Sequence, residues 1–142
     1  MRSPLTHSRR RAFTMVELLI VIAVIGIMSA LVISAFSNAA QDTRRVIARQ
    51  QQASLQSAVN AWVNSTSDKV SLSGARTLYN AAGSSKERLQ LVQAYIDDGT
   101  LAHFLANTTS DGEVKSAALK KTDQYLLLGP WDASSYPKVE LK

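Results

Sequence analysis

A single carboxylate, that of Glu17, lies inside a long apolar run of the sequence. It is the only ionisable side chain between Phe13 and Phe36, and a cluster of three arginines precedes it. A charge within a membrane-spanning helix costs about 2.5–3.5 kcal/mol on insertion scales, so such a charge usually has a partner or a function. The chemistry to explain is therefore the pairing of one buried acid with a cation.

The residues beyond the apolar run offer little catalytic chemistry. His103 is the one histidine after residue 12, and a lone histidine on an apolar segment is usually structural. The sequence contains no GxSxG, P-loop, HExxH or dinucleotide-binding motif, so we predict that the protein is not an enzyme. A membrane-anchored enzyme is the alternative, and its acids would be the pairs at a predicted helix end and turn, Asp97–Asp98 and Asp111/Glu113.

The sequence has no cysteine, which excludes disulfides, thiolate catalysis and Cys-based zinc sites. The acids Asp111, Asp123 and Asp132 are scattered and do not form a dense calcium-binding loop. Asp111 and Asp132 are weak calcium candidates in predicted turns. We otherwise predict no metal and no cofactor.

The net charge of +5 comes largely from the first residues of the chain. Four of the 16 Lys and Arg residues lie within residues 1–12, which leaves 12 against 11 acids in the rest. The cluster Arg9, Arg10 and Arg11 favours a cytoplasmic N-terminus, with the C-terminal part on the other side of the membrane. Lys120 and Lys121 belong to no basic stripe with interleaved aromatics, so we do not predict nucleic-acid binding.

The elements that carry these residues follow from composition. Residues 13–36 would cover roughly 36 Å as a helix, enough to cross a hydrocarbon layer of about 30 Å. A buried core helix is the alternative, but so small a protein has no interior to surround such a rod. The next stretch is rich in Ala, Gln and Arg, with a thin apolar face that includes Leu55 and Val59. We predict one continuous helix from about Phe13 to Trp62 and a polar break at 64–68.

The remainder of the sequence predicts a small head. Residues 84–99 resemble one helix, capped by Ser84 or Ser85 and ended by Gly99. Short β-compatible runs at 112–119, 124–130 and 138–142 predict two to four antiparallel strands. The expected fold is α+β: a long N-terminal helix, transmembrane in its first half and amphipathic in its second, packed on a head with a short helix and a small sheet. The expected domains are a cytoplasmic leader (1–12), a transmembrane and assembly helix (13–36), its amphipathic half (37–63) and the head (64–142).

The order of these features resembles the N-terminal signature of type IV pilins and type II secretion pseudopilins. That signature is a basic leader, a small residue, Phe-Thr-Leu-(Val/Ile/Leu)-Glu and about twenty apolar residues. Here it reads Arg9-Arg10-Arg11-Ala12, then Phe13-Thr14-Met15-Val16-Glu17, then the apolar run. The resemblance covers roughly the first fifty residues. Two positions depart from the pattern, since the family prefers Gly where Ala12 stands, and many members have Pro where Ser34 stands.

The resemblance implies a structural role. A prepilin peptidase would cut between Ala12 and Phe13 on the cytoplasmic side of the bacterial inner membrane and methylate the new Phe13 amine. The retained helix would anchor the subunit as a single span, with its head in the periplasm. An assembly platform in that membrane would then polymerise homologous subunits into a filament in the periplasm or at the cell surface, with Glu17 of one subunit meeting the Phe13 amine of the next.

Three other readings stay open at this stage. An ordinary signal peptide would have its apolar region at Leu18–Ile33 and its cleavage site within 34–40, and would release a soluble domain. A minor or tip pilin with an adhesion or DNA-binding role shares the same motif. A Glu17 side chain that reaches interfacial water would need no partner. The lack of cysteines leans toward a pseudopilin, because a disulfide-bounded loop is common in pilins.

Overall fold

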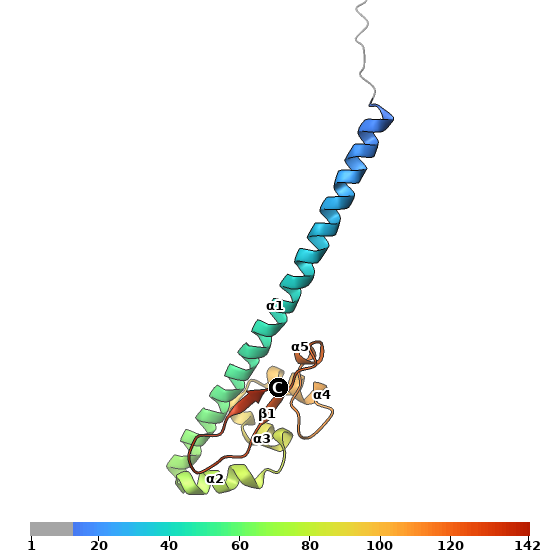
Figure 1. The fold of residues 1–142 in the computed structure, drawn as a ribbon. Helices are drawn as coiled ribbons and strands as arrows, with labels where there is room; N and C mark the ends of the chain where they lie inside the picture. Colours follow the sequence, from blue (N-terminus) through green and yellow to red (C-terminus); the bar gives the residue numbers. More distant parts are fainter. Residues whose placement is uncertain (1–12) are drawn as a thin grey trace, which may run out of the picture. The chain divides into compact units, whose positions relative to one another are not determined.

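The structure is a computed structural model that describes residues 13–142, and the chain divides into two compact units, Met1–Ala40 and Gln41–Lys142. Within the described part, one long helix, α1, is followed by short helices and a two-stranded sheet (Figure 1). The elements are α1 (Met15–Val70), α2 (Leu72–Ala81), α3 (Ser85–Leu91), the 3-10 helix η1 (Gln93–Tyr95), α4 (Asp98–Asn107), α5 (Ala117–Lys120), β1 (Leu126–Leu128) and β2 (Val139–Leu141). The predicted fold class, a long N-terminal helix packed on a small α+β region, is confirmed.

The helix α1 extends further than the sequence indicated. The predicted break at 64–68 is wrong, because these polar residues continue the helix to Val70. Asn, Ser, Thr and Asp lower helix propensity by only a fraction of a kcal/mol each. The buried side chains of Val59, Trp62 and Val63 anchor the preceding turns. Residues 64–68 therefore remain helical despite their lower helix propensity. Tertiary packing, rather than local propensity, decides where the helix ends.

Helix α2, which was not predicted, begins directly after α1. Ser71 joins the two with a φ of 74°, a left-handed conformation that ends the first helix. Its hydroxyl then accepts from the Gly74 N–H at 3.3 Å and caps the second helix. A Cβ added at Gly74 would lie 3.2 Å from Val70 Cγ2, so glycine fits the close approach of the two helices.

The single helix predicted for 84–99 is also wrong in its second half. Ser84 caps α3 as predicted, with its hydroxyl accepting from the Glu87 N–H at 3.2 Å. The α-helix stops at Leu91, however, and the chain is extended at Ile96, whose φ and ψ are −122° and 141°. Asp97 then starts a new helix, α4, so Gly99 lies in a first turn rather than at a helix end.

The sheet consists of two strands within the described residues. Strands β1 and β2 pair antiparallel, with Leu126 opposite Leu141 and Leu128 opposite Val139. The predicted strand at 112–119 forms only isolated bridges, from Val114 to Leu126 and from Glu113 to Ser110. The rest of that run becomes the short helix α5, which Ser116 caps by accepting from the Leu119 N–H at 3.2 Å.

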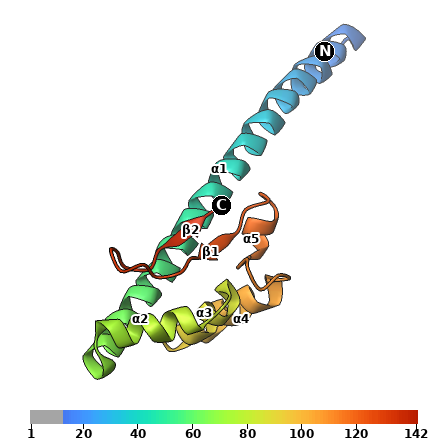
Figure 2. The same ribbon diagram turned by 60° about the horizontal axis from the view of Figure 1, so that its bottom comes forward.

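The core of the 41–142 unit lies where α1, the short helices and the sheet meet (Figure 2). Tyr79 is fully buried between two tryptophans, with ring centroids 5.9 Å from Trp62 and 6.3 Å from Trp131. The largest other side chains with no exposed surface are aliphatic: Leu89, Leu119, Leu126, Leu128, Val59, Val63, Val92 and Val114. The apolar face predicted on α1 therefore packs against residues far along the chain.

A buried arginine links α3 to the sheet. Arg88 is 8% exposed, and its Nη1 donates to the Leu128 carbonyl at 2.7 Å. Its guanidinium also lies over the Tyr79 ring, 5.4 Å from the centroid. Burial raises the pKa of the Tyr79 hydroxyl to about 12, although the nearby Arg88 charge acts in the opposite direction. A carbonyl and an aromatic face thus take the place of a carboxylate partner.

Two glutamines on α1 hold the C-terminal segment against the helix. Gln52 Nε2 donates to the Val139 carbonyl at 2.8 Å. Gln56 accepts from the Val139 N–H at 2.7 Å and donates to the Pro137 carbonyl at 2.9 Å. Polar residues interrupt the apolar pattern at these positions because their amides form hydrogen bonds with the backbone of Pro137 and Val139.

We predict that Gln56→Ala lowers the free energy of unfolding of the 41–142 unit by about 1–3 kcal/mol, because the part-buried Val139 N–H loses its acceptor. Urea unfolding of the full chain in detergent micelles, followed by the fluorescence of Trp62 and Trp131, measures this change. Gln50→Ala is the matched control, since Gln50 lies exposed on the same helix. Equal effects of the two substitutions would contradict the stabilising role of the hydrogen bonds between Gln56 and the C-terminal segment, which we call a glutamine clamp.

Candidate functional site

At the N-terminus of α1, Glu17 lies beside Thr14. Glu17 Oε2 accepts from the Thr14 N–H at 2.8 Å and lies 3.1 Å from Thr14 Oγ1, and Thr14 Oγ1 accepts from the Glu17 N–H at 3.2 Å. This reciprocal arrangement is a capping box, in which two side chains satisfy backbone donors that the first helical turn leaves free. The acid of the apolar run therefore has a partner within its own helix.

The capping box fixes where the carboxylate lies. A negative charge in the first turn is favoured by the helix dipole, and here it is also held by two hydrogen bonds to Thr14. The other oxygen, Oε1, has no hydrogen bond among residues 13–142. The Glu17 side chain is therefore oriented toward the start of the helix, and among residues 13–142 only one of its two oxygens is engaged.

Phe13 stands immediately before this cap and is 80% exposed. Ala12 and the arginines Arg9, Arg10 and Arg11 lie outside the described residues. Only the Phe13 side of the predicted cleavage position is therefore part of the structure.

The apolar run has no protein cover within its own unit. Every residue from 13 to 40 is exposed, and side chains such as Phe36 (72%) and Ile33 (70%) are open over most of their surface. Within 13–142, α1 is the one helix long and apolar enough to cross a membrane. The helix also continues through Ser34, where a kinking proline is absent. Such a surface is stable only in contact with lipid or with other apolar helices.

The other candidate residues serve local structure. His103 Nε2 accepts from the Ala117 N–H at 3.2 Å, so the histidine connects α4 to α5. Asp111 pairs with Lys86, with 3.1 Å between Oδ1 and Nζ, and Asp132 lies in the loop after β1. The described residues contain no group of three or more His, Cys, Asp or Glu side chains able to hold a metal.

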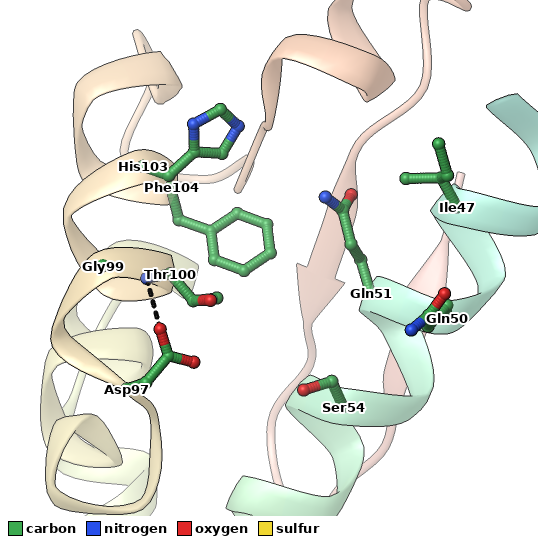
Figure 3. A pocket seen from close by; sticks show the side chains of 9 residues that line it. All are labelled: Ile47, Gln50, Gln51, Ser54, Asp97, Gly99, Thr100, His103 and Phe104. Carbon is green, nitrogen blue, oxygen red and sulfur yellow. Dashed lines mark hydrogen bonds between the residues drawn. The ribbon is translucent and has the colours of Figure 1, made fainter.

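A groove of about 450 Å³ separates α4 from the 47–54 part of α1 (Figure 3). Three of its polar side chains, Asp97, Gln51 and His103, form hydrogen bonds within the fold. Asp97 accepts from the Thr100 N–H at 2.8 Å, which holds the pKa of that carboxyl below its usual range, and Gln51 Oε1 accepts from Ser116.

The structural role of Thr14 was missed in the sequence, although Thr14 stands in the quoted motif. The signal was present, because Thr-x-x-Glu before an apolar run is the pattern of a capping box. The spacing that resembles a processing signal is therefore also the spacing that starts the helix.

Comparison with protein families gives one match. Residues 7–33 match the family model described as the prokaryotic N-terminal methylation motif. The chain carries an N-terminal methylation motif. This motif is typical of type IV pilins and type II secretion pseudopilins, and it implies processing by a prepilin peptidase. Neither the comparison with curated proteins nor the comparison with solved structures gives a match.

We predict that Thr14→Ala loosens the first turn of α1, because it removes the hydroxyl half of the cap and leaves the Glu17 N–H without its acceptor. Loss of a cap costs about 1 kcal/mol, which corresponds to roughly fivefold faster amide hydrogen exchange. Exchange at Met15–Glu17 in micelles, read by mass spectrometry, measures the effect. Ser29→Ala, which removes a hydroxyl further along the run, should leave these amides unchanged. Unchanged exchange in Thr14→Ala would contradict the capping box.

Proposed function

We propose that this protein is a structural subunit of a pilus-like filament, either a type II secretion pseudopilin or a type IV pilin. The observation that carries the proposal is the methylation motif at 7–33 leading directly into the one described helix able to cross a membrane. In this proposal a prepilin peptidase hydrolyses the Ala12–Phe13 peptide bond and methylates the freed Phe13 amine. The leader 1–12 is lost and the apolar helix is kept.

The apolar helix then has two successive environments. Before assembly, residues 13–36 span the inner membrane, with Arg9, Arg10 and Arg11 holding the leader on the cytoplasmic side and the head in the periplasm. After extraction by an inner-membrane assembly platform, the same side chains pack against those of neighbouring subunits. The exposure of every side chain from 13 to 40 supports this proposal, because both environments cover that surface.

Glu17 supplies the register between subunits. Cleavage leaves a cationic amine on Phe13, and an unpaired charge is strongly disfavoured in the apolar core of a filament. Thr14 occupies Oε2 of Glu17 and orients the carboxylate, while Oε1 remains an acceptor for the Phe13 amine of an adjacent subunit. Axial sliding would separate the two charges, so their pairing selects one stagger.

The mature N-terminus tests the processing step. Co-expression with a prepilin peptidase should give a chain that begins with methylated Phe13 in intact-mass and peptide mass spectra, and omission of the peptidase should leave residues 1–12 attached. Ala12→Gly should be processed at least as completely, because it restores the small residue that the family prefers. A chain beginning between Ser37 and Gln41 would instead indicate an ordinary signal peptide and overturn the proposal.

Glu17→Gln tests the pairing of charges. A Gln at this position still accepts from the Thr14 N–H, so the helix start is kept while the negative charge is lost. We expect the variant to insert and to be processed at Phe13, but to be absent from sedimented filaments. Glu17→Ala should show the same three results. The complementary control is Thr14→Ala, which keeps the charge and weakens the cap. Normal filament yield from Glu17→Gln would remove the charge-pairing role.

A further inference from the structure

A basic hollow opens on the 41–142 unit where α1 passes the turn between α5 and β1. Its volume is about 350 Å³. The lining combines cationic and hydrogen-bonding side chains and contains no apolar or aromatic one: Gln41, Arg44, Arg45, Lys121, Thr122 and Gln124. A hollow with this lining suits an anion better than an apolar ligand.

The cations of the hollow are only partly neutralised. Within residues 13–142, Arg44 and Lys121 form no ion pair. Arg45 meets Asp42 at 3.6 Å, but both side chains are more than 70% exposed, so this pair contributes little. The other acid beside the lining is Asp123, which stands between Thr122 and Gln124, so two carboxylates are set against the three cations of the hollow. The hollow keeps an excess of positive charge.

The turn also supplies a neutral side chain to the lining of the hollow. Asp123 has a φ of 53°, and this left-handed residue brings Thr122 and Gln124 close together. Thr122 Oγ1 lies 3.0 Å from Gln124 Oε1, which leaves the Gln124 NH₂ group free to donate. The residues that carry two guanidinium groups, an ammonium and an amide therefore line one hollow, although they come from two segments far apart in the sequence.

The position along the chain indicates where the anion comes from. The separation of Phe36 and Arg44 corresponds to about 12 Å of helix. The polar headgroup layer of a bilayer extends roughly 5–8 Å beyond the hydrocarbon on each side, and arginine side chains are long enough to reach back into it. If residues 13–36 span the membrane, Arg44 and Arg45 follow the span closely enough along the chain for their side chains to reach the phosphates of the adjoining leaflet.

We propose that Arg44, Arg45 and Lys121 form a site for the phosphodiester headgroup of an anionic phospholipid, used while the subunit is held in the membrane before assembly. The proposal rests on the membrane-spanning role of residues 13–36. Arginine binds phosphate oxygens in a bidentate manner, and a glycerol headgroup offers hydroxyls to the amides of Gln41 and Gln124. A nucleic acid would present the same phosphates, but the lining lacks an aromatic side chain for stacking bases.

Lipid retention by the full chain tests this site. Protein in neutral dodecyl maltoside micelles is titrated with phosphatidylglycerol or phosphatidylcholine, and bound lipid is counted by native mass spectrometry. We expect tighter retention of phosphatidylglycerol. A cation near an anionic lipid surface is worth roughly fivefold in affinity, so Arg44→Gln/Arg45→Gln/Lys121→Gln should weaken retention about 100-fold. The control Lys69→Gln/Lys86→Gln/Lys138→Gln removes as much charge elsewhere on the unit and should retain the lipid.

Several results would overturn the assignment: equal retention of the two lipids, unchanged retention by the first triple variant, or equal loss in the control. Inorganic phosphate that competes at the same concentration as lipid would indicate a free-anion site, and stronger competition by a single-stranded oligonucleotide would indicate nucleic-acid binding. The intact mass from the same spectra shows whether residues 13–36 are present, so failure of the membrane anchor is distinguished from failure of this site.

Discussion

The apolar side chains of residues 13–36 have no partner within their own unit, and this constraint governs the rest of the molecule. A surface of this kind is unstable in water and stable in a bilayer or a bundle of helices. The protein must therefore present the run in a form that both environments accept. A single helix meets this need, because all backbone groups except those of the first and last turns are satisfied internally.

The first turn of a helix leaves backbone N–H groups without partners, and the capping box of Thr14 and Glu17 supplies partners for two of them. Threonine and glutamate satisfy donors that neither lipid nor apolar neighbours could satisfy. The same carboxylate carries the one negative charge of the run, so the residue to which we assign the contact between subunits also has a local structural task. In the proposed filament the two tasks use different oxygens of Glu17, so substitution can separate them.

Much of the architecture could be predicted from the sequence. The apolar run and the Ala- and Gln-rich segment after it predicted the long helix, and Ser84 predicted the start of α3. The start of α4 at Asp97 was missed because the periodic pattern continues across the extended residue Ile96. The task of Gln56 could not be predicted, because its partners, Pro137 and Val139, are identified only by the tertiary fold. Of the candidate site, Glu17 was recognised, whereas its hydrogen bonds to Thr14 were not.

The glutamine clamps also constrain the order in which the chain acquires its structure. Gln52 and Gln56 bond to Pro137 and Val139, across sequence separations of 81 to 87 residues. Synthesis proceeds from the amino end, so the helix is made long before the segment that it clamps. Trp131, which closes over Tyr79, is likewise produced late. The 41–142 unit therefore completes its core only after nearly the whole chain has been translated, and until then the hydrophobic residues of α1 lack the late segments that bury them.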